Sequence, residues 1–407
     1  MFSRMLTFSE AREIVIAQAK SRLTPRSTLS LPLNDALSHI LAEEIRTDRE
    51  YPPFHRSTRD GYAVHSTEAQ PNASLRCVGE IKAGDTVHSP LSPGTCVQIM
   101  TGAALPPGAD AVVMIEFTRR DGDHVSFERP TQSRQNFVPR GSEASAGGVA
   151  LSPGLRLGYA EVAVAAQVGH PTLRCFQKPR IAILSTGDEV VPITESPGPF
   201  HIRNSNSVSL AAQVQLAGGT PLPLGNALDR VDDLSAKIEQ GLREEILVLS
   251  GGVSMGKYDL VESVLKGMGA EFYFDAVAIR PGKPAVFGRC RNTLIFGLPG
   301  NPVSTMVTFQ LFAIPALDIL SGAPSRPLPF LEATLAESVK EKPGLTHFLP
   351  ARLTWQNARP EVRVLRWQGS GDIGALAQSN CFAVVPWDRP EIPIGEPVEV
   401  LPRMDVL

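Results

Sequence analysis

Hydrophobic and polar positions repeat with different periods in different parts of the 407-residue chain. Residues 1–45 predict helix, in two amphipathic stretches that are broken at Pro25 and Pro32. An apolar, alanine-rich stretch over 151–169 predicts a return to helix. We therefore expect residues 1–45 and 146–176 to form one helical linking domain.

The pattern between these two parts has a shorter period. Segments such as Arg76–Lys82 and Cys96–Thr101 alternate between apolar and polar positions, and turns containing proline or glycine separate them. Short alternating segments of this kind are typical of β-strands. The sequence therefore predicts a β-rich insertion domain over residues 46–145.

An α/β pattern follows over residues 177–326. Three short apolar runs predict buried strands: Ile181–Ser185, Ile246–Ser250 and Thr293–Gly297. Helical patterns lie between and after them, one from Ser205 or Asn206 to Gly218, one over Val231–Leu242 and a long one ending near Leu320. Strands that alternate with helices predict a doubly wound, mostly parallel sheet with helices on both faces.

The helical pattern fades after Pro327. Alternating or apolar segments separated by proline and glycine predict a small antiparallel β-barrel domain over 327–407. The expected fold class is thus multidomain α/β, with the doubly wound sheet, the β-rich insertion, the helical linking domain and the C-terminal barrel as its parts.

Composition argues against several classes of binding partner and of structural site. A net charge of -3 gives no basic field, so neither nucleic acid nor an anionic membrane is an expected partner. The five cysteines are scattered and odd in number, which argues against a disulfide framework or a zinc site. The N-terminus lacks the apolar core of a signal peptide, and we expect no apolar run to be long enough to span a bilayer. We expect a cytoplasmic enzyme.

Small polar residues follow the predicted strands. Ser185 ends one strand, and Gly251, Gly252 and Ser254 follow another. Backbone N–H groups in such a loop can approach an anion closely, although a lone glycine-rich loop can also be a simple tight turn. Ligands of open α/β sheets sit beyond the carboxyl ends of the strands, so these loops are expected to converge on one site.

Carboxylates share the same placement. Asp188 and Glu189 follow one strand, Asp229 another, and Asp259 follows the glycine loop. Each of them alone would be an ordinary surface group, and Asp259 could instead cap a helix. Their common position at strand ends predicts a hard cation held by oxygen ligands, most simply Mg²⁺.

Two proline-stiffened turns complete the set. Arg280 and Lys283 lie on a basic turn that suits a phosphate or another oxyanion, although a basic surface turn is the plainer alternative. Pro299 and Pro302 bracket an irregular loop at a helix start, which alone would be a rigid connector. A metal ion would reconcile acidic and anionic groups in one site.

The insertion carries three further candidates. Asp60 lies in a tight turn, Thr101 follows an apolar strand and Glu143 lies in a polar turn. Each alone is ordinary loop chemistry.

Seven sequence runs become specific when taken together. They occur in the order RDGYA, IMTGA, PRGSE, STGDE, SGGVSMGKYD, RPGKP and GLPGNPVS. In this combination the chain closely resembles the molybdopterin molybdenumtransferase (MoeA) family, a relative of the E domain of gephyrin, from Phe8 to the C-terminal domain. The resemblance implies an elongated homodimer of four-domain subunits. It also implies that the α/β domain has the fold of the pterin-adenylating enzymes, and that residues 46–145 of one subunit close the site of the other.

The resemblance implies insertion of molybdenum from molybdate into adenylylated molybdopterin, with Mg²⁺-dependent hydrolysis of the adenylate and release of AMP. The implied catalytic residues are Asp60, Thr101, Glu143, Glu189, Asp229 and Asp259, of which the last three would also bind the metal. The implied substrate-binding residues are Ser185, Gly251, Gly252, Ser254, Arg280, Lys283, Pro299 and Pro302. The implied partners are the pterin-adenylating enzyme of the same pathway and the molybdoenzymes, or their chaperones, that receive the cofactor.

Two other functions are considered. A clustering scaffold of the gephyrin type would not need these carboxylates, so their retention favours the enzyme. A pterin adenylyltransferase normally carries a GGTG-type loop where this chain has Gly251-Gly252-Val253-Ser254, and it lacks the additional domains. Departures from the family pattern, such as Arg59 and Lys257, leave the choice between molybdate and tungstate open.

Overall fold

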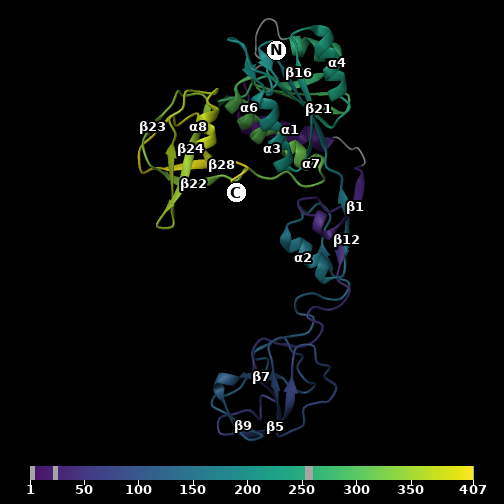
Figure 1. Cartoon of the computed structure of the whole chain (residues 1–407). Coiled ribbons are helices and arrows are strands. Elements are labelled where there is room, and N and C mark those ends of the chain that lie inside the picture. Colours follow the sequence, from purple (N-terminus) through teal and green to yellow (C-terminus); the bar gives the residue numbers. More distant parts are fainter. Residues whose placement is uncertain (1–4, 22–25, 253–259, 407) are drawn as a thin grey trace.

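The computed structural model describes residues 5–21, 26–252 and 260–406. The molecule is elongated, with a large α/β body beside a barrel at one end and a small β-sheet unit at the other (Figure 1). We call its parts the linking unit (26–45 and 146–176), the arm (46–145), the α/β unit (177–326) and the barrel (327–406). These names follow the expected domain limits, except that the described residues 5–21 are left out of the linking unit; the limits stay predictions.

The α/β unit is built on a six-stranded sheet in the order β16-β13-β17-β21-β20-β18. Its strands are β16 (Thr220–Ala227), β13 (Arg180–Thr186), β17 (Ile246–Ser250), β21 (Thr293–Leu298), β20 (Val286–Cys290) and β18 (Glu271–Phe274). The first four are parallel, while β20 runs antiparallel to both of its neighbours. A mostly parallel sheet is therefore confirmed, and the antiparallel hairpin at one edge adds to the prediction.

Helices cover both faces of this sheet. They are α3 (Ser205–Ala217), α4 (Val231–Gly241), α5 (Leu260–Gly267) and a continuous helix made of α6 (Pro302–Thr308), a π-helical turn (Phe309–Ala313) and α7 (Ile314–Leu320). In β13, Ile181 and Ile183 join the core with α3 and α7, whereas Ala182 and Leu184 join the core with α4 and α5. This alternation places the strand between two apolar layers, as the doubly wound prediction requires.

The long helix corrects one expectation. Pro302–Leu320 is long and apolar enough to cross a membrane by length and composition, so the expectation that no segment reaches this length is wrong. In the structure 89% of this segment is buried inside the protein. A central helix of an α/β core has the same composition as a membrane span because it, too, contacts apolar groups on all sides.

The N-terminal region is only partly helical. Helix α1 (Phe8–Ser21) is present, and its buried face of Ala11, Val15 and Ala19 packs in the core of the α/β unit. The second predicted helical stretch is wrong, since residues 28–32 form strand β1, which pairs antiparallel with β12 (Thr172–Phe176). Leu29 and Leu31 alternate with more exposed neighbours, which is the period of a strand.

The linking unit therefore contains more strand than expected. Besides β1 and β12 it has helix α2 (Tyr159–Gln167) and the pair β2 (Ile45–Arg46) with β11 (Val149–Leu151). The helix at 159–167 agrees with the predicted return to helix.

The arm is a six-stranded sheet, so the β-rich prediction is confirmed. In spatial order its strands are β7 (Ala111–Met114), β4 (Gly61–Val64), β6 (Thr95–Ile99), β5 (Ser74–Ile81), β9 (His124–Phe127) and β8 (Thr118–Asp121). Two small cores, one on each side of this sheet, hold it together.

The C-terminal part is a closed five-stranded barrel, also as predicted. Its strands, in order around the barrel, are β24 (Thr346–Gln356), β25 (Arg359–Val364), β22 (Leu331–Leu335), β28 (Pro397–Pro402) and β26 (Cys381–Val385), which pairs back to β24. The pair β22–β25 is parallel, so the barrel is not wholly antiparallel. Strand β19 (Ile279–Arg280) of the α/β unit pairs with β24 and ties the basic turn to the barrel.

Candidate functional site

A cleft of about 470 Å³ lies at the carboxyl ends of the parallel strands. Ser185 and Thr186 end β13, Ser250 ends β17, and the loop after β21 supplies Pro299 and Gly300. Parallel strands end at the same edge of a sheet, which brings these segments together although they are far apart in the sequence.

The cleft unites half of the residues that the sequence singles out. They are Ser185, Glu189, Asp229, Gly251, Gly252, Pro299 and Pro302. Ser254 and Asp259 lie outside the described residues. Arg280 and Lys283 do not line the cleft, but Pro284 does, so their turn lies beside it.

The glycine loop is built tightly against β13. Gly251 and Gly252 have φ angles of +92° and +63°. A Cβ at Gly251 would lie 2.7 Å from the carbonyl oxygen of Thr186, and one at Gly252 would lie 2.6 Å from Thr186 Oγ1. The N–H of Gly251 donates to the carbonyl oxygen of Leu298. Gly251 therefore shapes the loop and joins it to β21, while its amide is not free for a ligand.

Three carboxylates gather on one wall of the cleft. The backbone N–H of Asp229 donates to Asp188 Oδ1 at 3.0 Å, and Glu189 lines the same wall. Burial raises the pKa of Asp229, and the negative charges of Asp188 and Glu189 raise it further. No ion pair relieves these three acids within the part of the chain that the structure describes. A cation would relieve their repulsion, which fits the kind of site predicted.

The metal ligands themselves are not assembled. Across residues 5–21, 26–252 and 260–406, no three acidic, histidine or cysteine side chains are close enough to hold a metal ion. The third predicted ligand, Asp259, falls outside these ranges, so the set of Glu189, Asp229 and Asp259 stays a prediction.

Two asparagines that the sequence analysis missed organise the cleft. Asn204 Oδ1 accepts from the backbone N–H of Ser207, which caps α3, and from Ser185 Oγ. Asn206 Nδ2 donates to Ser250 Oγ at 2.8 Å and to the carbonyl oxygen of Gly300 at 2.7 Å. Asn206 thus ties α3 to the ends of β17 and β21. The signal was the Asn204-Ser205-Asn206 run at a helix start, which suits both capping and anion binding.

Two buried polar atoms beside the cleft lack a partner. Neither Asn206 Oδ1 nor Thr186 Oγ1 forms a hydrogen bond to any described residue. Buried polar atoms are normally paired, so unpaired ones in a cleft wall are candidates for contact with a ligand or water.

The basic turn that carries Arg280 and Lys283 is held rigidly. Gly282 has a φ of +109° and packs against Thr308 and Ile279, and the carbonyl oxygen of Lys283 accepts from two backbone N–H groups. The side chains of Arg280 and Lys283 form no ion pair with any residue that the structure describes. Two cations on a fixed turn next to the cleft can attract an anionic ligand.

The remaining predicted residues lie in the arm. Asp60 Oδ1 accepts from the backbone N–H of Thr101 at 2.7 Å and from Thr101 Oγ1 at 2.8 Å, and these hydrogen bonds lower the pKa of Asp60. Glu143 forms an ion pair with Arg56 at 2.9 Å. None of these three residues lines the cleft of its own chain. The arm, marked by β5, β7 and β9, lies at the opposite end of the molecule from the α/β unit (Figure 1).

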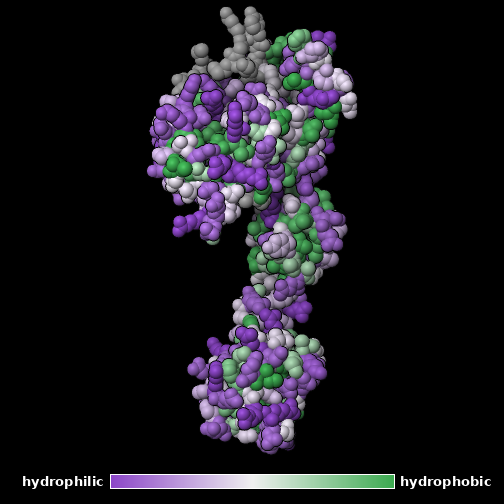
Figure 2. Space-filling model, turned by 60° about the vertical axis from the view of Figure 1, so that its left-hand side comes forward, coloured by the Kyte–Doolittle hydropathy of each residue, from purple (hydrophilic) through white to green (hydrophobic). Residues whose placement is uncertain are grey.

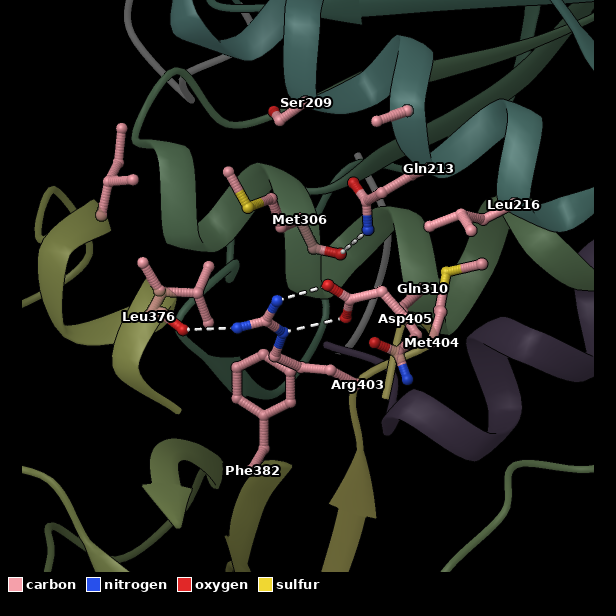
Figure 3. Close-up of a pocket in the computed structure, with 13 residues that line it drawn as sticks. Ser209, Gln213, Leu216, Met306, Gln310, Leu376, Phe382, Arg403, Met404 and Asp405 are labelled. Carbon is pink, nitrogen blue, oxygen red and sulfur yellow. Dashed lines mark hydrogen bonds and ion pairs between the residues drawn. The ribbon is translucent and has the colours of Figure 1, made fainter. Parts of the chain in front are cut away.

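A second cavity of about 260 Å³ lies between α3, α6 and the barrel (Figure 3). Its wall is mostly apolar, and none of the predicted site residues lines it. Its one cation, Arg403, is engaged by Asp405 and by the carbonyl oxygen of Leu376. This cavity lies at a junction between the α/β unit and the barrel and has no visible link to the predicted chemistry.

Three family models match successive parts of the chain. The MoeA N-terminal region (domain I and II) matches residues 6–169, the probable molybdopterin binding domain matches 182–319, and the MoeA C-terminal region (domain IV) matches 332–402. The second match contains the cleft.

Relatives match over nearly the full length. The molybdopterin molybdenumtransferase of Bacillus subtilis (strain 168) is 33% identical over 381 residues, which cover 91% of this chain and 88% of the relative. That of Staphylococcus aureus (strain MRSA252) is 30% identical and covers 92% of this chain and 90% of the relative.

Solved structures share the whole architecture. A molybdopterin biosynthesis MoeA protein from Pyrococcus horikoshii OT3 has a TM-score of 0.79 at 26% identity, covering 98% of this chain and 100% of that one. A second crystal structure of such a protein has a TM-score of 0.75 at 29% identity, with coverage of 98% and 99%. On these matches the chain belongs to the MoeA family of molybdopterin molybdenumtransferases.

Proposed function

We propose that this protein inserts molybdenum from molybdate into adenylylated molybdopterin, with Mg²⁺-dependent hydrolysis of the adenylate and release of AMP. Its relatives are named for molybdenum transfer to molybdopterin. The observation that carries the proposal is the cleft, where an acidic wall lies next to a basic turn whose cations form no ion pair with the described residues.

The two walls suit different parts of such a substrate. Arg280 and Lys283 supply positive charge for molybdate and for the phosphates of the adenylate. Glu189 and Asp229, with Asp259 in addition, would hold Mg²⁺, which when bound neutralises the acids and polarises a phosphoryl oxygen. Ser185, Gly252 and Ser254 would contact the phosphates, and Pro299 and Pro302 would shape the loop beneath the pterin. The α/β unit would then share its fold with the pterin-adenylating enzymes.

The arm requires a second copy of the chain. We propose a homodimer in which Asp60, Thr101 and Glu143 of one subunit complete the cleft of the other. The linking unit exposes large apolar residues, including Leu37 (53% exposed), Val149 (50%) and Leu155 (41%), and Figure 2 shows hydrophobic surface gathered on this middle part of the molecule. Exposed apolar surface of this kind commonly marks a protein–protein interface.

The proposed reaction fixes the neighbours in the pathway. A pterin-adenylating enzyme must supply the substrate, and molybdoenzymes or their chaperones must receive the product. Neither partner is a nucleic acid or a membrane.

Reconstitution tests the proposal directly. The purified protein is incubated with adenylylated molybdopterin, molybdate and Mg²⁺, and both AMP release and cofactor formation are followed. Both products should appear together and should need Mg²⁺. Glu189→Gln should abolish them, whereas Glu195→Gln, an exposed acid of the same loop region, should not. AMP release without cofactor formation, or no release at all, would contradict the proposed function.

A further inference from the structure

A single buried carboxylate joins α7 to the linking unit and to the connection that leads to the barrel, and through that connection to α1. Asp318, in α7, is fully buried. Its Oδ1 accepts from Arg156 Nη2 of the linking unit at 3.0 Å and from Arg326 Nη2, on the connection to the barrel, at 2.8 Å. Its Oδ2 accepts from the backbone N–H of Arg326 at 3.0 Å, and the carbonyl oxygen of Arg326 accepts from Arg12 of α1.

Further contacts between the linking unit and the α/β unit lie at the same end of α7. Arg26 Nη2 donates to the carbonyl oxygen of Ile319 at 2.8 Å. Within the linking unit, the same guanidinium lies 5.6 Å from the centre of the Phe176 ring. A Cβ at Gly322 would lie 2.4 Å from Phe176 Cδ2. The linking unit is thus seated on residues 318–322 by one ion pair, one hydrogen bond and one close apolar contact.

The charge of Asp318 is needed at this place. Burial lowers the pKa of Arg156, and the positive charge of Arg326 lowers it further, while Asp318 opposes both effects. Without the carboxylate, two guanidinium groups would face each other in a half-buried space. A buried charge that loses its partner is much more costly than an exposed one.

A change in the angle between the linking unit and residues 318–322 would also move the arm. Between the linking unit and the arm, the two connecting segments are tied to each other by the bridge of Tyr51 with Ala144 and by the hydrogen bond from Thr47 Oγ1 to the carbonyl oxygen of Ser145 at 2.6 Å. The strands β5, β7 and β9 of the arm lie beyond this connection, at the far end of the molecule (Figure 1). Asp60 directly precedes β4, which pairs with β7, and Asp60 is hydrogen-bonded to Thr101. A small change of angle at residues 318–322 therefore becomes a large displacement at Asp60.

We propose that Asp318 is a positioning residue that sets, through Arg156, the angle at which the arm leaves the α/β unit. The inference rests on the proposed function in one respect, that Asp60 and Thr101 act in the cleft of a partner subunit. Reaction geometry is sensitive to position, and a misplacement of about 1 Å can lower a rate by roughly 100-fold. Asp318 touches no residue of the cleft, so its effect would act on turnover and leave binding of the adenylate intact.

Arg156→Gln is the sharpest test, because it releases the linking unit and keeps the pair of Asp318 with Arg326. We expect small-angle X-ray scattering of the full-length protein to show a changed or broader distribution of interatomic distances. We expect kcat for molybdenum insertion to fall by on the order of tenfold or more, with KM for adenylylated molybdopterin and Kd for AMP unchanged. Arg156→Lys, which keeps the charge, should restore part of kcat.

Two further variants complete the design. Lys340→Gln breaks an exposed ion pair with Glu391 in the barrel and should change neither scattering nor kcat. Asp318→Asn should act like Arg156→Gln but more strongly, and if it fails to fold, Arg156→Gln still decides. Unchanged scattering and kcat in Arg156→Gln, or an equal loss of AMP affinity, would overturn the inference. If the unsubstituted protein had no insertion activity, the proposed function would be contradicted instead. The scattering data would still show whether Arg156 sets the angle between the linking unit and the α/β unit.

Discussion

The cleft of the α/β unit and the Asp60 turn of the arm place acids in opposite electrostatic settings. In the cleft, burial and two neighbouring acids raise the pKa of Asp229. In the arm, hydrogen bonds from the backbone N–H and the hydroxyl of Thr101 lower the pKa of Asp60. The cleft acid is therefore short of a cation, whereas the arm acid is already stabilised as an anion by its own turn.

The two regions also assemble in different ways. Four segments that are remote in sequence meet in the cleft because parallel strands end at one sheet edge. In the arm, Asp60 and Thr101 meet because antiparallel pairing sets Gly61 opposite Ile99. One sheet edge can collect motifs from its own sheet, but two sheets at opposite ends of one chain can share a site only through another subunit or a large motion.

The largest loss of activity is expected for the substitution of an acid in the cleft. Asp229→Ala should lower kcat for insertion by on the order of 100- to 1,000-fold, because it removes charge that acts where charge develops in the reaction. Single-turnover kinetics with adenylylated molybdopterin would measure it. Asp232→Ala, an exposed acid in the first turn of α4, is the matched control and should keep wild-type turnover.

The arm side is tested by mixing subunits. Asp60→Ala alone should cost roughly 10- to 100-fold in kcat, the size expected for loss of a charged hydrogen-bonding group. Mixed dimers of Asp60→Ala with Asp229→Ala should regain activity, because one of their two clefts then has neither lesion. Absence of any gain after subunit exchange would place both acids in the site of one chain and remove the contrast between the regions.

A substitution in the glycine loop should have an intermediate effect, on the affinity for AMP. Gly252→Ala forces an L-residue into a positive φ and brings a Cβ against Thr186 Oγ1. This strain costs about 1–2 kcal/mol, so the affinity for AMP should fall roughly tenfold. Calorimetric titration with AMP measures the change, and Gly267→Ala, whose Cβ meets no atom within 4 Å, should leave it unaltered.

The smallest effect is expected on the unfolding temperature and its dependence on pH. Because the pKa of Asp229 is raised in the folded protein, its ionised form destabilises the fold at neutral pH, and this penalty disappears as the pH falls below the ordinary range of an aspartate. Asp229→Asn should therefore raise the unfolding temperature slightly at pH 7, and the gain should vanish in acid. Asp60→Asn should show the opposite sign, since its lowered pKa stabilises the fold above the ordinary aspartate range. Equal signs for the two variants would contradict the electrostatic contrast.

Much of the fold follows from short-range pattern. The strands at Ile246–Ser250 and Thr293–Leu298 and the helix beginning at Ser205 appear where periodicity and capping predict them. The antiparallel β20 and β18 and the strand at Thr28–Pro32 were not predicted. Period alone does not separate short, half-buried strands from helix in a sequence rich in proline.

The site was predicted in part for the same reason. Residues at or just beyond the carboxyl end of a parallel strand, such as Ser185 and Asp229, converge because the parallel topology places those strand ends together. Asn206 was missed, since its role depends on hydrogen bonds to Ser250 and Gly300, which are remote in sequence. Asp318 was missed because an aspartate inside an apolar helix predicts nothing until its arginine partners are known.

Patterns along the chain predict most of the helices and strands, the strand ends that carry chemistry and the resemblance to one family. These depend on interactions within a few residues and on motifs that can be compared directly. Three features could be seen only in the folded protein: α1 packs in the α/β unit, Asp60 does not line the cleft of its own chain, and one buried carboxylate joins the linking unit to α7. Such features depend on contacts between segments that are far apart in the sequence. The period of apolar residues shows which face of an element is buried, but it does not show which other element that face contacts.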